Sequence, residues 1–257
     1  MRVSIRLLGG FAVDIEGTEL DLAALPRRSR ELVQLIALSP GHHLSRDRVI
    51  EHLFGHLGPE AAAANLHKAA SLARRHLGTT TSVTIRAGLV SLWPEHTVEV
   101  DAVRFENEAD AALRSGAADR CQDALCLYRG DLLPDSLSEE WAIEPRRHLR
   151  AVFVELLRAA GEWQRLIEVE PTSEEAASHL MRLSAEQGDT AGVVNRFKSL
   201  EAAMARELSL QPSSETTALY QELTRGPALV APVAARSPLI GRNRLLSAMK
   251  EVMDTTE

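Results

Sequence analysis

The chain has 257 residues, 45% of them hydrophobic and 25% charged, with a formal net charge of −7. This length allows two ordinary domains, and the composition excludes wholesale disorder. No apolar run is long enough to cross a membrane, and residues 1–10 lack the apolar core of a signal peptide, so we expect a cytoplasmic protein without a membrane partner.

The negative net charge conceals a basic segment. Between Pro26 and Arg86, nine basic residues stand against four acidic ones, so this stretch carries +5 and the rest of the chain carries −12. The segment is therefore compatible with a nucleic-acid partner, which the charge of the whole chain would disfavour.

Short strands are expected first. Apolar and polar residues alternate at 3–7 and again at 11–15, and residues 20–22 follow a turn signal at Glu16-Gly17. This pattern predicts a small antiparallel sheet.

Three helices are expected after the strands. The first starts at Pro26 and ends at Pro40-Gly41, because proline is favoured in a first turn and disfavoured in a helix interior. The second begins after the N-cap Ser45, and the third runs from about residue 60 to residue 77.

Strand-like alternation returns at residues 83–92, where Ala87-Gly88 marks the turn of a β-hairpin. A sheet, three helices and a hairpin in this order are most simply combined in a winged helix-turn-helix domain. We place this DNA-binding domain at residues 1–96.

The pattern then becomes helical up to about residue 224, which predicts an all-α domain at residues 97–225. The expected helices, separated by glycines and prolines, span residues 101–114, 117–129, 138–160, 173–187, 189–207 and 213–224. The helices on either side of Gly188-Asp189 resemble an antiparallel hairpin of a solenoid. The fold class expected for the chain is mainly α with a small β part.

Residues 226–238 hold three prolines, small side chains and one charge, which predicts a linker. Residues 239–257 then begin a further amphipathic helix. This stretch is too short to build a domain, and we interpret it as the start of a truncated module.

The third helix carries the best candidates for reading DNA. A helix in the major groove needs small or polar residues and hydrogen-bond donors on its outer face. Such donors occur here at spacings of three and four: Asn65, His67, Lys68, Ser71, Arg74 and Arg75. An ordinary solvated face would look similar, but the position of this helix between a second helix and a hairpin favours DNA recognition, with Arg74 and Lys68 as the leading contacts.

Five further arginines are candidates for phosphate contacts. Arg86 lies beside the hairpin turn, and Arg27, Arg28, Arg46 and Arg48 lie near helix starts, where the helix N-terminus also attracts anions. Each of them could equally be a solvated surface residue.

No sequence pattern points to an enzyme, a cofactor or a metal site. We find no nucleophile elbow and no phosphate-binding glycine loop. His52 and His56 are four apart on the second helix, but Leu53 stands where a metalloprotease has Glu, and no further ligand set follows. Cys121 and Cys126 are five apart on an expected helix, and we expect both to be small buried side chains.

The chain resembles the Streptomyces antibiotic regulatory protein family over about residues 3–224. Residues 5–11 (IRLLGGF) are similar to the opening of the family, residues 44–50 (LSRDRVI) to its second helix, and residues 64–78 to its recognition helix. The run LYRGDLLPD at residues 127–135 resembles the family's bacterial transcriptional activation domain, a tetratricopeptide-like helical unit.

The resemblance implies a transcriptional regulator that binds promoter DNA, activates transcription and contacts RNA polymerase or its own regulatory module. Binding as a homodimer or on tandem direct repeats is what it implies about assembly. Residues 239–246 resemble the entry to a signalling ATPase module that larger members carry. ATP would then bind only through that downstream module.

Two positions depart from the family's pattern. Leu72 stands where the family often has Arg, and Ala73 where it often has Leu. These residues and the acidic 97–225 region motivate an alternative, in which the chain is a protein-interaction and regulatory module of a larger signalling ATPase with weak or no DNA binding. A DNA affinity that depends on salt concentration would favour the DNA-binding regulator over this alternative.

Overall fold

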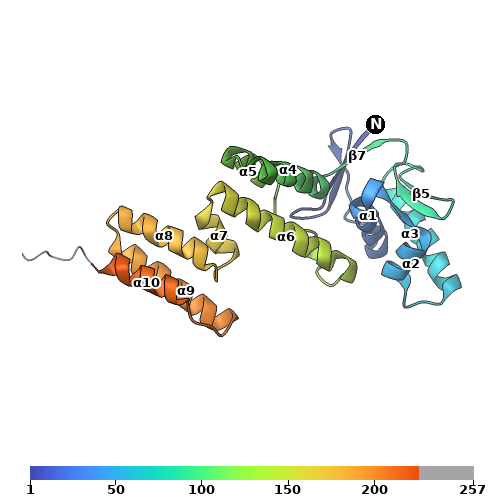
Figure 1. Cartoon of the computed structure of the whole chain (residues 1–257). Helices are drawn as coiled ribbons and strands as arrows, with labels where there is room; N and C mark the ends of the chain where they lie inside the picture. The colour runs from blue at the N-terminus through green and yellow to red at the C-terminus, as the bar shows by residue number, and fades with distance from the viewer. Residues whose placement is uncertain (226–257) are drawn as a thin grey trace, which may run out of the picture. The chain divides into compact units, whose positions relative to one another are not determined.

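The computed structural model describes residues 1–225, and its fold is mainly α with a small β part, as expected (Figure 1). The predicted linker at 226–238 and the predicted module at 239–257 lie outside the described residues. The chain forms two compact units that divide between Ala177 and Ser178. Along the described residues, no helix is long and apolar enough to span a bilayer.

The first unit opens with a four-stranded sheet of order β3-β2-β1-β7. Its strands are β1 (Arg2–Arg6), β2 (Ala12–Ile15), β3 (Thr18–Glu19) and β7 (Thr97–Val100). The three N-terminal strands pair antiparallel, which confirms the small antiparallel sheet predicted at this end of the chain, and β7, which the sequence did not predict, pairs with β1 in parallel. A parallel neighbour needs a long crossover, which here contains the whole helical part of the winged helix.

The three predicted helices and the predicted hairpin are confirmed. The elements of this part are α1 (Arg27–Leu38), η1 (Pro40–His42), β4 (His43–Ser45), α2 (Arg46–Phe54), α3 (Pro59–His76), β5 (Val83–Arg86) and β6 (Leu89–Leu92). A second sheet of order β4-β6-β5 joins the hairpin to the segment before α2. Leu32, Ile36, Leu53, Leu66 and Trp93 are almost completely buried and form the centre of this core.

Four helices follow in the first unit, packed in sequence onto one another. They are α4 (Asp101–Ser115), α5 (Ala118–Leu125), α6 (Glu140–Ala160) and α7 (Trp163–Val169). The sequence did not predict α7, which is too short to show helical periodicity. A glycine in the left-handed conformation, Gly161 with φ +72°, separates it from α6.

The helix expected at 117–129 ends four residues early, because the chain turns back to the N-terminal sheet. Leu133 N donates to Leu7 O at 2.9 Å, and Gly9 N donates to Asp131 O at 3.0 Å. The backbones approach so closely that a Cβ on Gly9, whose φ is +74°, would lie 2.7 Å from the Arg129 carbonyl oxygen. A short turn of 3-10 helix, η2 (Pro134–Ser136), leads into α6.

The C-terminal helices are α8 (Glu174–Glu186), α9 (Thr190–Glu207) and α10 (Ser214–Thr224), and the boundary between the two compact units falls within α8. Arg196 Nε donates to Ser184 Oγ at 3.2 Å between α8 and α9. The rings of Phe197 and Tyr220 stack at 4.2 Å between α9 and α10. These contacts agree with the predicted helix hairpins of a tetratricopeptide-like domain.

Candidate nucleic-acid interface

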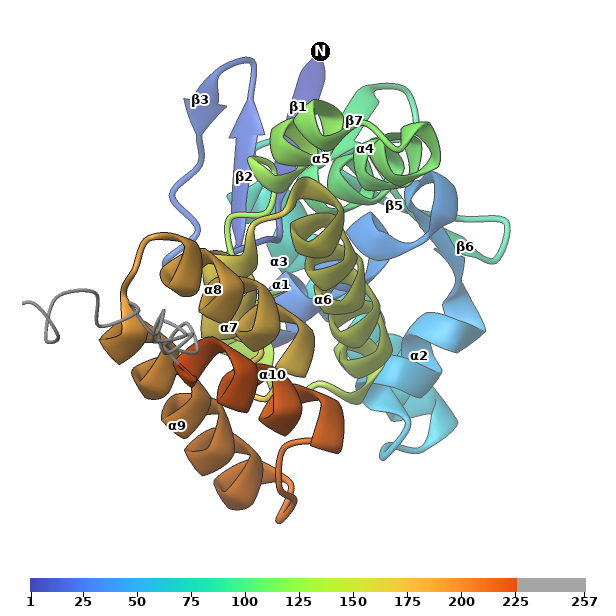
Figure 2. The same cartoon turned by 60° about the vertical axis from the view of Figure 1, so that its left-hand side comes forward.

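The wing and the two helices of the helix-turn-helix are tied together by backbone contacts. Figures 1 and 2 show α2 and α3 side by side, with the hairpin of β5 and β6 projecting next to them. The first backbone amide of α2, Arg46 N, donates to Gly88 O at the hairpin turn at 2.8 Å. The Ser45 hydroxyl caps α2 by accepting from Arg48 N. The start of α2 and the tip of the wing are therefore held in one frame.

One side of α3 is fixed by the core. Ala62, Leu66, Ala70 and Ala73 are almost completely buried and lie at spacings of four, four and three. Residues with this spacing share one face of a helix. The opposite side of α3 must therefore face away from the core.

That opposite side is formed by Ala64, Lys68, Ser71 and Arg75, at spacings of four, three and four, and all four are exposed. We call these four residues the α3 stripe. A methyl group at Ala64 permits a close approach, while the Lys, Ser and Arg side chains supply donors for base edges and phosphates. The stripe therefore exposes side chains of the types that contact base edges and phosphates in DNA.

The remaining predicted residues of α3 lie on the edges of the stripe. His67 and Asn65 are exposed, and the Asn65 amide donates to Ala61 O of its own helix at 2.8 Å. Arg74 is half-buried, and its Nε is enclosed without a hydrogen-bond partner among the described residues. Arg75, which the sequence did not rank among its leading contacts, belongs to the stripe, whereas Arg74 does not.

The two departures from the family's pattern also lie off the stripe. Leu72 is half-buried, and Ala73 is completely buried in the core. Neither residue belongs to the exposed face. The departures from the family's pattern at these two positions therefore do not change Lys68, Ser71 and Arg75.

Three of the arginines predicted to contact phosphates lie on the wing and on α2. Arg86 is exposed beside a tight turn whose central residues, Ala87 and Gly88, have φ of 50° and 74°. Positive φ at both central positions is the type I′ geometry that matches the twist of a hairpin. On α2, Arg48 is exposed and Arg46 is half-exposed.

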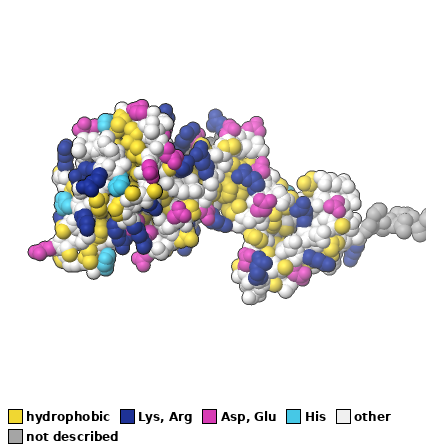
Figure 3. Space-filling model, turned by 180° about the vertical axis from the view of Figure 1, so that it is seen from behind, with side chains coloured by type: hydrophobic (Ala, Val, Ile, Leu, Met, Phe, Trp, Pro, Cys, Tyr) yellow, Lys and Arg dark blue, Asp and Glu magenta, His cyan; other side chains and the backbone are white. Residues whose placement is uncertain are grey.

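Within residues 1–225, no acidic side chain forms an ion pair with Arg48, Lys68, Arg75 or Arg86 of this face. No hydrogen bond to a described residue holds these four side chains either. Figure 3 shows Lys and Arg side chains, with histidines between them, over the part of the molecule that the winged helix forms. An anionic partner would supply the missing charges.

Arg27 and Arg28, in contrast, have partners in the chain. Arg27 Nε donates to Glu31 Oε1 and Arg28 Nη1 to Glu31 Oε2, both at 2.6 Å. Arg27 Nη2 also donates to Glu139 at the start of α6. A phosphate contact from either arginine would have to compete with these pairs.

Glu139 is buried, yet its pKa is lowered. Burial alone would raise this pKa, but hydrogen bonds from Arg27 and Glu31 and the positive charges of Arg27 and Arg28 together outweigh it. Local sequence pattern could not predict its ion pair with Arg27 of α1, because Arg27 precedes Glu139 by 112 residues.

Asp101, the first residue of α4, links that helix to the end of strand β1. Its carboxylate accepts from Leu7 N at 2.7 Å and from Leu8 N at 3.1 Å. Burial raises the pKa of Asp101, although three backbone donors and the charge of Arg129 act in the opposite direction.

The other candidate residues give no site. Residues 1–225 contain no group of three or more His, Cys, Asp or Glu side chains that could hold a metal ion. His52 and His56 are exposed. Cys121 is buried as expected, but Cys126 is exposed, so that prediction is wrong for Cys126 because α5 ends at Leu125, one residue before it.

Comparison with known proteins agrees with this architecture. Residues 100–224 match the family model of the bacterial transcriptional activator domain. Among solved structures, the chain is similar to Mycobacterium tuberculosis EmbR, determined in complex with a low-affinity phosphopeptide. The TM-score is 0.64 at 18% identity, over 98% of this chain and 71% of that chain, which shows a shared fold. A search of curated proteins found no match.

The matched domain therefore lies directly behind the winged helix, in the order that the sequence predicted. The matched domain and the shared fold agree with the predicted resemblance to the Streptomyces antibiotic regulatory proteins, which are transcription regulators.

Proposed function

We propose that this chain is a transcription regulator, which binds duplex DNA in the cytoplasm and activates transcription. In this proposal α3 enters the major groove with the α3 stripe toward the bases, and the wing contacts the backbone through Arg86. The observation that carries the proposal is the α3 stripe itself, exposed and opposite the buried face of the helix.

Charge supports the same geometry. The stripe, the start of α2 and the wing each bring an arginine or lysine that no acidic residue of the described chain neutralises. Phosphates are the partners that such side chains lack, and their binding releases counterions. Arg46 and Arg48 are the best placed to add phosphate contacts, because their segment is bonded to the wing.

The helical domain would then contact RNA polymerase, which the resemblance to antibiotic regulatory proteins implies. Binding as a homodimer or on tandem direct repeats is part of the same proposal. Sites selected from random duplex DNA by the full chain distinguish these two modes, because a symmetric dimer selects inverted half-sites and tandem binding selects repeats in one orientation.

The test is a fluorescence-anisotropy titration with a selected duplex at several salt concentrations. Lys68→Ala and Arg75→Ala should each weaken binding by about 1–3 kcal/mol, and loss of a phosphate contact should lower the salt slope by about one. Arg114→Ala is the matched control, since Arg114 is an exposed arginine of α4, outside the winged helix.

Equal affinity of both variants and the wild type for the duplex would remove α3 from the interface. No salt-dependent DNA binding by the wild type would instead support the alternative, a protein-interaction module of a larger signalling ATPase. The half-buried position of Leu72, away from the stripe, favours DNA binding over that alternative.

A further inference from the structure

A pocket lies beside α1 where three parts of the chain meet. Two residues of α1, Arg30 and Gln34, form one wall, and residues 19–23 and the segment around η2 contribute to the others. The pocket has a volume of about 330 Å³, at the lower end of the range for sites of small organic ligands. All of its lining residues belong to the first compact unit, and we call it the α1 pocket.

Gln34 is buried in this wall with an unsatisfied amide. It is 1% exposed, and its Oε1 has no hydrogen-bond partner within residues 1–225. Buried polar groups are nearly always hydrogen-bonded, so an unpaired one requires an explanation. A ligand in the α1 pocket would provide it, because Gln34 lines the pocket and the last torsion of a glutamine side chain rotates easily.

The guanidinium group of Arg30 lies one helical turn before Gln34. Its Nη2 donates to Leu22 O at 3.3 Å, which holds the group against the chain after β3. Arg30 Nε has no partner in the described part of the chain, and no ion pair with Arg30 occurs there. Side chains four residues apart on a helix are neighbours on one face, so α1 presents a cationic donor next to the unpaired amide.

Acidic side chains line the same pocket and disfavour an anionic ligand. Asp21 and Asp135 both line it, and neither carboxylate forms an ion pair with a described residue. Asp21 Oδ1 accepts from Ala23 N at 3.0 Å. Because these two carboxylates outnumber the single guanidinium of Arg30, a neutral ligand suits the pocket better than an anion.

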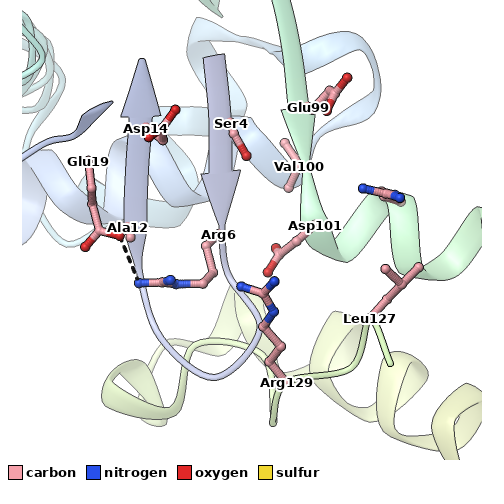
Figure 4. Close-up of a pocket in the computed structure, with 11 residues that line it drawn as sticks. Ser4, Arg6, Ala12, Asp14, Glu19, Glu99, Val100, Asp101, Leu127 and Arg129 are labelled. Carbon is pink, nitrogen blue, oxygen red and sulfur yellow. Dashed lines mark ion pairs between the residues drawn. The ribbon is translucent and has the colours of Figure 1, made fainter. Parts of the chain in front are cut away.

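A neighbouring pocket between β1, β2 and α4 differs, because its charged groups face one another (Figure 4). Arg6 pairs there with Glu19 at 3.5 Å. The Arg129 side chain reaches toward Asp101, and its charge acts on that carboxyl group. Glu19 also lines the α1 pocket, and its ion pair with Arg6 makes it less available to a ligand there.

We propose that the α1 pocket binds a small neutral ligand that carries a carboxamide group. An amide edge has one acceptor next to one donor, so it pairs with the Gln34 amide through two hydrogen bonds in either orientation of that side chain. The ligand's carbonyl oxygen also accepts from Arg30. Its apolar body packs against Phe11 and Leu20, which line the pocket and are half-buried.

The test is a ligand-detected NMR titration of the full chain without DNA, so its result does not depend on the proposed DNA binding. The probes are benzamide and isovaleramide, each compared with its N,N-dimethyl amide and its carboxylate. Both analogues lack the N–H donor, and the carboxylate also adds a negative charge. At least one carboxamide should bind about ten-fold more tightly than both of its analogues.

Two variants locate the binding. Gln34→Leu removes the amide at similar size, and Arg30→Lys keeps the positive charge but removes the guanidinium donors. Each change should weaken carboxamide binding about ten-fold. Gln34→Leu should not lower the melting temperature, because an apolar side chain replaces a buried amide whose oxygen is unpaired.

Matched controls lie outside the pocket. Gln221→Leu changes an exposed glutamine of α10, and Arg114→Lys changes an exposed arginine of α4. Both should bind the carboxamide as the wild type does.

Three outcomes would overturn the proposal. They are no binding of either carboxamide up to about 10 mM, equal binding of an N,N-dimethyl amide or a carboxylate, and binding that survives Gln34→Leu and Arg30→Lys. Unfolding curves of each variant verify that a loss of binding comes from a folded chain.

Discussion

At the scale of single residues, the helical phase of α3 separates two neighbouring arginines. Arg75 lies in the exposed stripe, whereas Arg74 lies at its edge with its Nε enclosed. We expect Arg75→Ala to weaken DNA binding by about 1–3 kcal/mol with little change in the melting temperature. Arg74→Ala should lower the melting temperature, because its partly buried stem packs against the fold, and should change DNA affinity less.

Anisotropy titrations and thermal unfolding of the two variants check this difference. The placement of Arg75 in the DNA interface is contradicted if Arg74→Ala weakens DNA binding more than Arg75→Ala does and leaves the melting temperature unchanged.

The periodicity of the sequence was sufficient to predict the set of donors on α3. It could not rank them, because the side of the helix that faces outward is set by packing against α1 and α2.

At the scale of elements, ion pairs join α1 to α6. The sequence contains the charged residues but does not show that they pair. Glu139 is buried between Arg27 and Arg28 beside Glu31. We expect Glu139→Gln to lower the free energy of unfolding by about 1 kcal/mol, a modest value because Arg27 is largely exposed to solvent. Urea unfolding followed by circular dichroism measures the change.

Glu140→Gln is the control for this prediction, because Glu140 is the next residue of α6 and is exposed. A loss of stability as large in Glu140→Gln as in Glu139→Gln would show that the ion pairs are not the cause.

The helices and strands themselves were largely predictable from the sequence where they are long and periodic. The parallel strand β7 and the short helix α7 were not, since each depends on contacts with distant or neighbouring segments.

At the scale of the whole molecule, the contacts that join the winged helix to the helical region link residues far apart in the sequence. Leu7 and Leu8 donate to Asp101, and Leu133 donates to Leu7. The sequence predicted a domain boundary at residues 96–97, while the compact units divide at residues 177–178. Local pattern marks where element types change, but compactness follows these long-range hydrogen bonds and ion pairs, which pattern does not contain.

The two buried carboxyl groups that make long-range contacts, Glu139 and Asp101, predict opposite responses of stability to pH. The pKa of Glu139 is lowered from its ordinary 4.5, so its stabilising contribution is complete above pH 4.5 and is lost as the pH falls through the lowered value. The pKa of Asp101 is raised from its ordinary 3.8, so its contribution is present below pH 3.8 and is lost as the pH rises through the raised value.

Urea unfolding of the wild type, Glu139→Gln and Asp101→Asn over a range of pH separates the two. The stability advantage of the wild type over Glu139→Gln should shrink as the medium is acidified below pH 4.5. Its advantage over Asp101→Asn should grow on acidification, because protonation relieves the buried charge while the carboxyl group keeps an oxygen that accepts from the backbone. If both differences change with pH in the same direction, then one of the two carboxyl groups does not lie in the environment described for it.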